Sequence, residues 1–182
     1  IARLVPQKGI HLIEHAIKTA AGRYQFVLQG TTQDPVVLAE FEQLKQEYET
    51  SPDVRILLQI REDLAHRIYA ASDLCLVPSL FEPCGLVQLI ALRYGSVPIV
   101  RRTGGLLDTI TDGENGLCFD YPNNGSINWV IDRALQLWKD KNNWRVLVER
   151  CMEYDFSWHK PTQNYLSVYT MAQNGEQAAR IT

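Results

Sequence analysis

Residues 74–110 read LCLVPSLFEPCGLVQLIALRYGSVPIVRRTGGLLDTI, and their apolar pattern decides the fold. The runs Leu74 to Val77 and Val97 to Val100 are short and apolar, as buried strands are. Gly85 to Tyr94 lies between them with apolar residues at helical spacing, and Leu106 to Ile110 starts a further helix. Strands and helices in this order predict βαβ units on a parallel sheet.

The same alternation continues outward along the chain in both directions. Upstream, we expect strands over residues 1–5, 24–28 and 54–60, and helices over residues 10–20, 36–48 and 62–71. Gly22 is placed to close the first of these helices and Pro35 to open the second. Downstream, Leu117 to Phe119 predicts a last short strand. Because the strands are nearly continuous apolar runs, the sequence predicts an α/β fold with a doubly wound parallel sheet of the Rossmann-like kind.

The last third of the chain has a helical pattern. Helices are expected over residues 126–139, 142–154 and 161–173, and their expected first or capping residues are Ser126, Asn142 and Pro161. Trp129, Leu135 and Trp138 mark the expected apolar stripe of this extension. The predicted organisation is one domain, with an α/β core over 1–125, C-terminal helices over 126–173 and a frayed tail over 174–182.

Composition excludes several classes of function. The 182 residues carry a net charge of −3 with a pI near 5.8, which gives no electrostatic reason to expect a nucleic-acid or membrane partner. No apolar run approaches the roughly 20 residues that span a bilayer. The four cysteines are widely spaced and form no CxxC pair, so neither a zinc site nor a disulfide framework is expected, and a reducing compartment is favoured.

Two loops that follow predicted strands carry groups suited to an anionic sugar ligand. Arg3 and Lys8 flank a turn that leads into a helix, where two cations and free amide groups suit a diphosphate. Glu82 lies in a proline-rich turn before a helix and can accept hydrogen bonds from sugar hydroxyls. The amides of Gly85 and Leu86 can donate to the same ligand. Taken separately, each loop also fits an ordinary surface turn.

A third loop, Thr103-Gly104-Gly105, lets the backbone approach an anion closely, although a glycine pair alone is a weak signal. The loop at residues 30–35 lacks the GxGxxG spacing, and no GxxxxGK[ST] occurs, so an NAD enzyme and a P-loop NTPase are disfavoured. His11 and His15 lie one helical turn apart without an accompanying acid or third ligand, so no metal site is predicted.

Together, these loops resemble one family closely. The run PSLFEPCGLVQL at residues 78–89 and the run RYGSVPIVRRTGGL at residues 93–106 are similar to segments of starch synthases and bacterial glycogen synthases. The run RLVPQKG at residues 3–9 is similar to the phosphate-binding segment of the same family and comes in the same order. The resemblance is strong to about Asn115 and looser to Tyr169.

The resemblance implies the C-terminal, nucleotide-sugar-binding half of a two-domain retaining glucosyltransferase. The implied sugar donor is ADP-glucose, and the implied acceptor is the non-reducing end of an α-1,4-glucan, bound mainly by the other domain. Arg3 and Lys8 would neutralise the diphosphate and the charge that develops on the leaving group. Glu82 would bind the glucose hydroxyls. The further substrate-binding residues implied are Cys84, Gly85, Leu86, Thr103, Gly104, Gly105 and Ile60. No metal and no cofactor are implied.

Three positions depart from the family pattern and leave alternatives open. Ile60 stands where the family often has a tyrosine that stacks on adenine, so UDP-glucose stays an alternative to ADP-glucose. Val87 replaces a common threonine. Ile90 stands where related transferases carry a second glutamate, which favours starch and glycogen synthases over sucrose or trehalose-phosphate synthases. A non-catalytic, synthase-like binding or regulatory module is the other alternative.

The resemblance carries two more expectations. The other domain of the family supplies the acceptor groove and further groups at the reacting centre, so we expect this chain alone to transfer no sugar. The expected location is the cytoplasm if the source is bacterial and the plastid stroma if it is a plant or an alga.

Overall fold

Six short parallel strands form the centre of the structure, a computed structural model that describes residues 1–173. They form two three-stranded sheets, in the orders β1-β2-β3 and β4-β5-β6. The bounds of the strands are β1 Ala2–Arg3, β2 Phe26–Thr31, β3 Val54–Leu57, β4 Leu74–Val77, β5 Val97–Arg101 and β6 Leu117–Phe119. The registers pair Arg3 with Thr31 and Val77 with Val100, so the strands of each sheet end along one edge.

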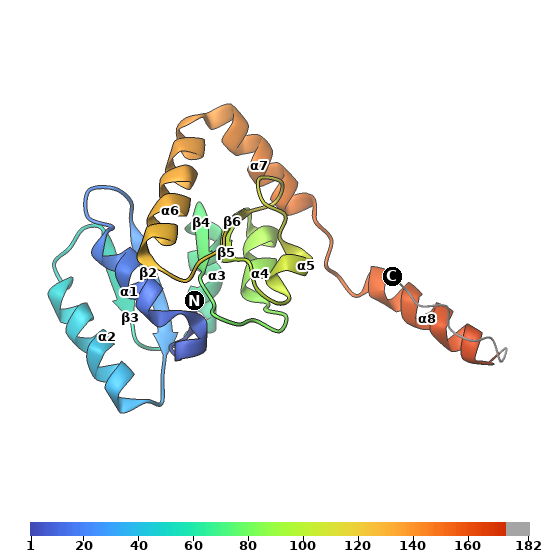
Figure 1. The fold of residues 1–182 in the computed structure, drawn as a ribbon, viewed down its shortest axis with the longest axis horizontal. Coiled ribbons are helices and arrows are strands. Elements are labelled where there is room, and N and C mark those ends of the chain that lie inside the picture. Colours follow the sequence, from blue (N-terminus) through green and yellow to red (C-terminus); the bar gives the residue numbers. More distant parts are fainter. Residues whose placement is uncertain (174–182) are drawn as a thin grey trace.

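The helices cover the sheets, as Figure 1 shows. Their bounds are η1 Pro6–Lys8, α1 Ile10–Lys18, α2 Pro35–Glu47, α3 Glu62–Ala71, α4 Val87–Tyr94, α5 Leu106–Thr109, α6 Asn124–Lys139, α7 Lys141–Glu153 and α8 His159–Gln173. Helices α1 and α2 bury apolar side chains against β1, β2 and β3. Helices α4 and α7 pack against β4 and β5 in a second cluster, and α6 joins α1 to β5 and β6 in a third. Apolar burial on both faces of the sheets is the main source of stability.

A cavity of about 850 Å³ lies between the two sheets. Its lining includes residues of β1, β2 and β4, with α3 and α6. Strand β1 pairs with β2 only at Ala2 and Arg3, while β2 begins earlier, at Phe26. Within the described residues, the edge of β2 from Phe26 to Leu28 and the outer edge of β4 therefore have no strand beside them at this cavity.

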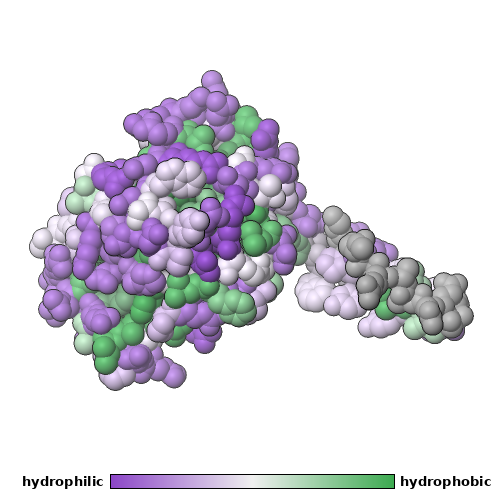
Figure 2. Space-filling view, viewed as in Figure 1, coloured by the Kyte–Doolittle hydropathy of each residue, from purple (hydrophilic) through white to green (hydrophobic). Residues whose placement is uncertain are grey.

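Helix α8 stands away from the rest of the chain (Figure 1), and none of its described side chains is buried. The visible face of the main body is largely polar with scattered apolar patches, as Figure 2 shows. No helix among residues 1–173 is long and apolar enough to cross a membrane.

The predicted α/β Rossmann-like fold with C-terminal helices is confirmed, with one difference in the sheet. The expectation was one doubly wound sheet, whereas the described strands form two parallel sheets that are not hydrogen-bonded to each other. Helix α3 and strands β4 and β6 have the bounds that the sequence predicts. The expected tail at 174–182 lies outside the described residues.

Several predicted boundaries were wrong. Strand β2 was expected over residues 24–28 and runs over Phe26–Thr31, while β3 was expected to reach residue 60 and ends at Leu57. The first helix ends at Lys18, and Gly22 lies in the turn that follows. The caps of α6 and α7 are Asn123 and Asp140, whose side chains accept hydrogen bonds from backbone amides.

The predicted apolar stripe of α6 was right for Leu135, which is half-buried and packs against the third cluster, but wrong for the two tryptophans. Trp129 is 56% exposed and Trp138 is 39% exposed. The buried side chains of this helix are Ile127, Val130, Ile131 and Ala134. Small and branched residues pack closely against α1 and β6, and the tryptophans lie outside that contact.

Candidate functional site at the strand ends

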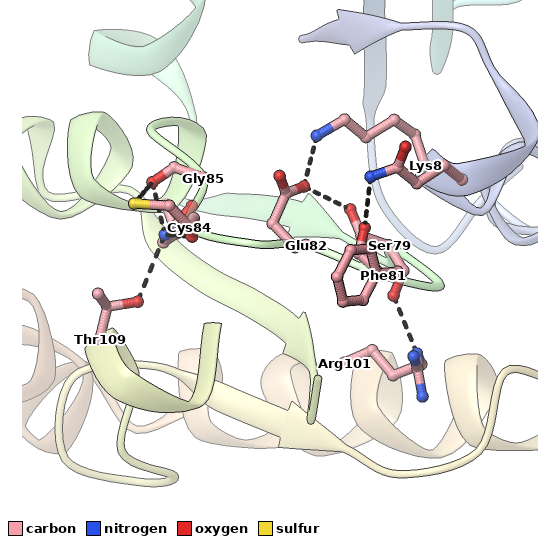
Figure 3. A network of polar contacts seen from close by, with 10 residues as sticks. Lys8, Ser79, Phe81, Glu82, Cys84, Gly85, Arg101 and Thr109 are labelled. Atoms are coloured by element: carbon pink, nitrogen blue, oxygen red, sulfur yellow. Dashed lines mark hydrogen bonds and ion pairs between the residues drawn. The ribbon is translucent and has the colours of Figure 1, made fainter. Parts of the chain in front are cut away.

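Lys8 and Glu82 meet at the carboxyl ends of β1 and β4. The Lys8 ammonium forms an ion pair with Glu82 Oε2, and the Ser79 hydroxyl donates to the same oxygen at 3.0 Å. Figure 3 shows the Glu82 carboxylate between these two side chains. Glu82 and Ser79 are buried and Lys8 is half-buried, so the ion pair is only partly screened by water. The carboxylate is thereby held in one orientation, with both contacts on one oxygen.

The turn that carries Lys8 is joined to the loop that carries Glu82. The Leu80 amide donates to the Gln7 carbonyl at 2.8 Å, and the Gln7 side chain donates to the Phe81 carbonyl at 3.0 Å. Gly9 has φ of +67°, and a Cβ there would lie 2.2 Å from the Pro78 carbonyl oxygen. Only glycine allows this approach. The two turns are therefore fixed against each other by one main-chain hydrogen bond and by one from the Gln7 side chain to a carbonyl 74 positions away.

The glycine pair Gly104-Gly105 packs closely against the loop that carries Glu82. A Cβ on Gly104 would lie 2.2 Å from the Glu82 carbonyl oxygen, and one on Gly105 would lie 2.5 Å from that of Pro83. The Gly105 amide donates to the Glu82 carbonyl at 2.9 Å. The Gly105 amide is thus engaged within the protein, and a contact of this residue with a phosphate stays a prediction. The Thr103 hydroxyl lies 3.5 Å from the Leu80 carbonyl.

The residues after Glu82 are open to solvent. Cys84 is exposed, Leu86 is 67% exposed and Gly85 has φ of +85°. Beneath them the buried Gln88 carboxamide donates to the carbonyls of Cys84 and Gly85, at 3.0 and 2.9 Å. The backbone of this turn is therefore held from its inner side, while its outer side is free for a ligand.

Arg3 and Ile60 lie apart from this hydrogen-bonded network. Arg3 is exposed at the end of β1, and Ile60 is 49% exposed in the loop between β3 and α3. Among residues 1–173, the Arg3 guanidinium has no hydrogen-bond or ion-pair partner, and the Ile60 side chain is apolar. Val87 and Ile90, the other departures from the family pattern, are half-buried on α4.

Sequence reasoning missed four residues of the network: Gln7, Ser79, Gln88 and Arg101. Arg101 is the last residue of β5, and its guanidinium donates to the carbonyls of Ser79 and Leu80. All four lie inside or beside the quoted runs, so a polar side chain next to a glycine or proline turn was the available signal. The carbonyls that Gln7, Gln88 and Arg101 contact carry no signal in the sequence.

The remaining polar groups do not form a competing site. Among residues 1–173, no three His, Cys, Asp or Glu side chains gather as metal ligands. The His15 ring hydrogen-bonds the Asn128 side chain at 2.8 Å, which joins α1 to α6. Burial raises the pKa of the Cys118 thiol to about 11 and that of Cys151 to about 12, so both stay protonated core residues.

Comparisons with known proteins identify the family of the chain. The family described as "Glycosyl transferases group 1" matches residues 1–146. A glycogen synthase of Protochlamydia amoebophila is 48% identical over 93% of this chain, and a probable starch synthase 4 of Arabidopsis thaliana is 46% identical over 93%. The chain spans 36% of the first relative and 17% of the second.

Solved structures give the same result. The catalytic domain of starch synthase IV from Arabidopsis thaliana, bound to ADP and acarbose, matches with a TM-score of 0.86 and 45% identity. The match covers 93% of this chain and 37% of that one. The Anabaena protein HepE with UDP-glucose matches with a TM-score of 0.73 at 17% identity, which shows a shared fold alone. The chain belongs to the group 1 glycosyl transferases and corresponds to the C-terminal portion of glycogen and starch synthases.

Proposed function

We propose that this domain binds ADP-glucose and presents its glucosyl group for transfer, with retention, to the non-reducing end of an α-1,4-glucan. The observation that carries the proposal is the contact of Lys8 with Glu82 where β1 and β4 end. A cation and a sugar-hydroxyl acceptor side by side suit a ligand in which a diphosphate is joined to a hexose. The ADP in the starch synthase IV complex supports the choice of nucleotide.

Each side chain has a defined part in this proposal. Arg3 and Lys8 neutralise the diphosphate, and the same charges stabilise the leaving group as the glycosidic bond breaks. Glu82 accepts hydrogen bonds from glucose hydroxyls through Oε1, because Lys8 and Ser79 both contact Oε2. Cys84 and the amides of Gly85 and Leu86 line the open side of the same turn.

Ile60 and the 103–105 loop complete the proposed contacts. Ile60 covers one face of the base with an aliphatic side chain, which is exposed and therefore available. Thr103 and Gly104 lie nearest the phosphates, while Gly105 acts through the Glu82 carbonyl. The glucan is bound mainly by the other domain. We propose the cytoplasm of a bacterium or the plastid stroma as the location, since the Arabidopsis relative is described as chloroplastic or amyloplastic.

Lys8 couples the two halves of the donor. In the free domain its ammonium satisfies Glu82, and a bound diphosphate places a second anion beside the same cation. The bound diphosphate attracts the Lys8 ammonium and so weakens its ion pair with Glu82. Oε2 of Glu82 then becomes available to the sugar hydroxyls, in addition to Oε1. A nucleotide without the β-phosphate would not do this.

A calorimetric titration of the domain with ADP, UDP and NAD tests the proposal. We expect saturable binding of ADP, weaker binding of UDP and none of NAD. Lys8→Ala should weaken ADP binding by about ten- to a hundredfold, since a charge-assisted hydrogen bond contributes roughly 1.5–3 kcal/mol. Lys18→Ala is the matched control, because Lys18 pairs with Glu14 on the exposed face of α1. No binding of ADP, or equal loss in both variants, would contradict the proposal.

UDP-glucose is the second candidate donor, favoured by one observation. Ile60 offers no aromatic ring for adenine, so the preference for the larger base is reduced. UDP binding tighter than ADP binding in the same titration would select it. The non-catalytic alternative is separated by glucan elongation assays: this chain alone should show none, and a protein that joins it to its companion domain should elongate.

A further inference from the structure

The segment that carries Glu82 has almost all its carbonyl groups held by other parts of the domain. These contacts are Arg101 to the Ser79 and Leu80 carbonyls, Gln7 to Phe81, the Gly105 amide to Glu82, and Gln88 to Cys84 and Gly85. A loop without regular secondary structure would otherwise sample many conformations. The loop is therefore fixed before any ligand arrives, and the position of its one carboxylate is set by these contacts.

Arg101 makes two of these contacts with one side chain. Its Nε donates to the Ser79 carbonyl at 2.9 Å, and Nη2 donates to the Leu80 carbonyl. The side chain is half-buried, so water competes little for it. A planar guanidinium holds two acceptors at a fixed spacing, which the single ammonium of a lysine cannot reproduce. Figure 3 shows Arg101 reaching this segment from the opposite side to Lys8.

The contact with the Ser79 carbonyl leads directly to the carboxylate. The Ser79 hydroxyl donates to Glu82 Oε2 at 3.0 Å, and this serine is buried. Fixing the Ser79 backbone fixes the hydroxyl that orients Glu82. By contrast, the structure records no contact between Arg101 and Lys8 or Arg3, the residues proposed for the phosphates.

We infer that Arg101 is a positioning residue for the sugar moiety of the donor, which acts through the orientation of Glu82 and has no part in binding the phosphates. This inference rests on the proposed function, in which Glu82 binds the sugar. It assigns Arg101 a measurable signature: the residue contributes to the binding of the nucleotide sugar and not to that of the nucleotide alone.

Arg102 provides a matched control. It is the next residue in the chain and carries the same charge, but it pairs with Asp112 at 3.7 Å and Asp120 at 3.2 Å. Neither partner lies in the Glu82 segment. The two neighbouring arginines therefore lie in different surroundings, Arg101 at the Glu82 segment and Arg102 at the two aspartates.

The experiment compares the affinities for ADP-glucose and ADP in the domain and in Arg101→Ala, Arg101→Lys and Arg102→Ala. We expect Arg101→Ala to weaken ADP-glucose binding by about tenfold, from the loss of charge-assisted hydrogen bonds, and to change ADP binding by less than about twofold. Arg101→Lys should not restore the affinity for ADP-glucose. Arg102→Ala should leave both affinities unchanged. Binding of ADP by each variant shows that it is folded.

A double-mutant cycle with Glu82→Gln separates positioning from a general structural effect. If Arg101 acts through the carboxylate, Arg101→Ala should have little further effect on ADP-glucose affinity in the Glu82→Gln background. Equal weakening of ADP and ADP-glucose, no weakening of either, or full additivity with Glu82→Gln would overturn the inference. A wild-type domain that binds neither ligand would instead contradict the proposed function, and the inference with it.

Discussion

Gly104 shows most directly how single residues build this site. Its φ is +46°, and a Cβ would lie 2.2 Å from the Glu82 carbonyl oxygen. Any side chain therefore strains the backbone and also displaces the loop that holds the carboxylate. The sequence predicts that the glycine pair after β5 lies near an anion. In the structure, the space that side chains of this pair would fill is occupied by the loop that carries Glu82.

The first prediction compares two glycines with positive φ. Gly104→Ala should lower the free energy of unfolding by about 2 kcal/mol or more, because backbone strain and steric overlap act together. Gly22→Ala is the control, since φ there is +68° and no heavy atom lies within 4 Å of the place that a Cβ would take. It should cost only about 1–2 kcal/mol. Urea unfolding of both variants measures the difference, and equal losses would contradict the assigned overlap.

The carboxylate of Asp112 connects three parts of the chain. It accepts hydrogen bonds from Arg133 at 2.7 Å and from the Cys118 amide at 2.8 Å, and Arg102 lies 3.7 Å away. Partial burial opposes its charge, but these hydrogen bonds and cations outweigh burial and hold the pKa of Asp112 below its ordinary value of 3.8. The unfolded chain therefore takes up this proton more readily than the folded one.

The second prediction concerns acid stability. The contribution of Asp112 is fully present well above pH 3.8 and is lost as the pH falls through 3.8 toward the lower pKa of the folded protein. Asp112→Asn should reduce the free energy of unfolding at neutral pH by about 1–2 kcal/mol and flatten its decline below about pH 5. Denaturant unfolding between pH 7 and pH 3 measures this. Parallel stability curves for the two proteins would show that the charge of Asp112 contributes nothing.

Residue types and their order predicted Lys8 and Glu82 as candidate site residues. The contacts of Gln7 and Arg101 could not be predicted, because both side chains bind main-chain carbonyls distant in sequence. A carbonyl is the same for every residue, so which one faces a given side chain depends on the completed fold. Whether these residues bind the sugar donor stays a prediction until the titrations are made.

Among the elements, α6 shows how a helix boundary is chosen. Its cap is expected at Ser126 from the sequence, whereas Asn123, three residues earlier, is of an equally suitable residue type. The structure begins the helix at Asn124, and the Asn123 side chain accepts from the Ser126 amide at 2.9 Å. Ile127 and Val130, in the turn that follows, are buried in the contact with α1 and β6.

The third prediction tests that cap. Asn123→Ala should lower the free energy of unfolding by about 1 kcal/mol, whereas Ser126→Ala should change it by less than about 0.5 kcal/mol. Both residues lie in the same turn, so each variant serves as the control for the other. Thermal or urea unfolding decides between them. A larger loss in Ser126→Ala would restore the boundary predicted from the sequence.

The apolar pattern of the sequence was enough to predict whether a segment is a strand or a helix. It did not fix the residue at which each strand or helix ends. Strand β3 stops at Leu57 although apolar residues continue to Ile60. The neighbouring strand β2 pairs with it only as far as Gln29 opposite Leu57, so the next residues have no partner in that ladder and turn toward α3. Pairing length is a property of two strands, and one segment alone does not reveal it.

At the scale of the molecule, the C-terminal helices have different relations to the core. Helix α7 buries Trp144, Leu147 and Cys151 against α4 and β5. Helix α8 has no buried side chain among those described and stands apart in Figure 1. The sequence grouped both in one extension, because similar helical patterns occur in packed and in solvent-exposed helices.

The fourth prediction follows from this difference. A chain that ends at Phe156 should keep the melting temperature and the ADP affinity of the longer chain, since α8 contributes no buried apolar area. A chain that ends at Lys139 should fail to fold cooperatively, because it lacks the three core residues of α7. Calorimetric melting and ADP titration measure both. Loss of cooperative unfolding in the chain that ends at Phe156 would contradict the prediction.

The cavity between the sheets has a consequence for handling the domain in solution. Unpaired amide and carbonyl groups of β2 and β4 lie beside about 850 Å³ of space lined by apolar residues. Such an edge is a template for a strand from another molecule. The domain should therefore form oligomers as its concentration rises, as light scattering would detect. In concentrated solutions, self-association through this edge will therefore contribute to the measured signal together with ligand binding.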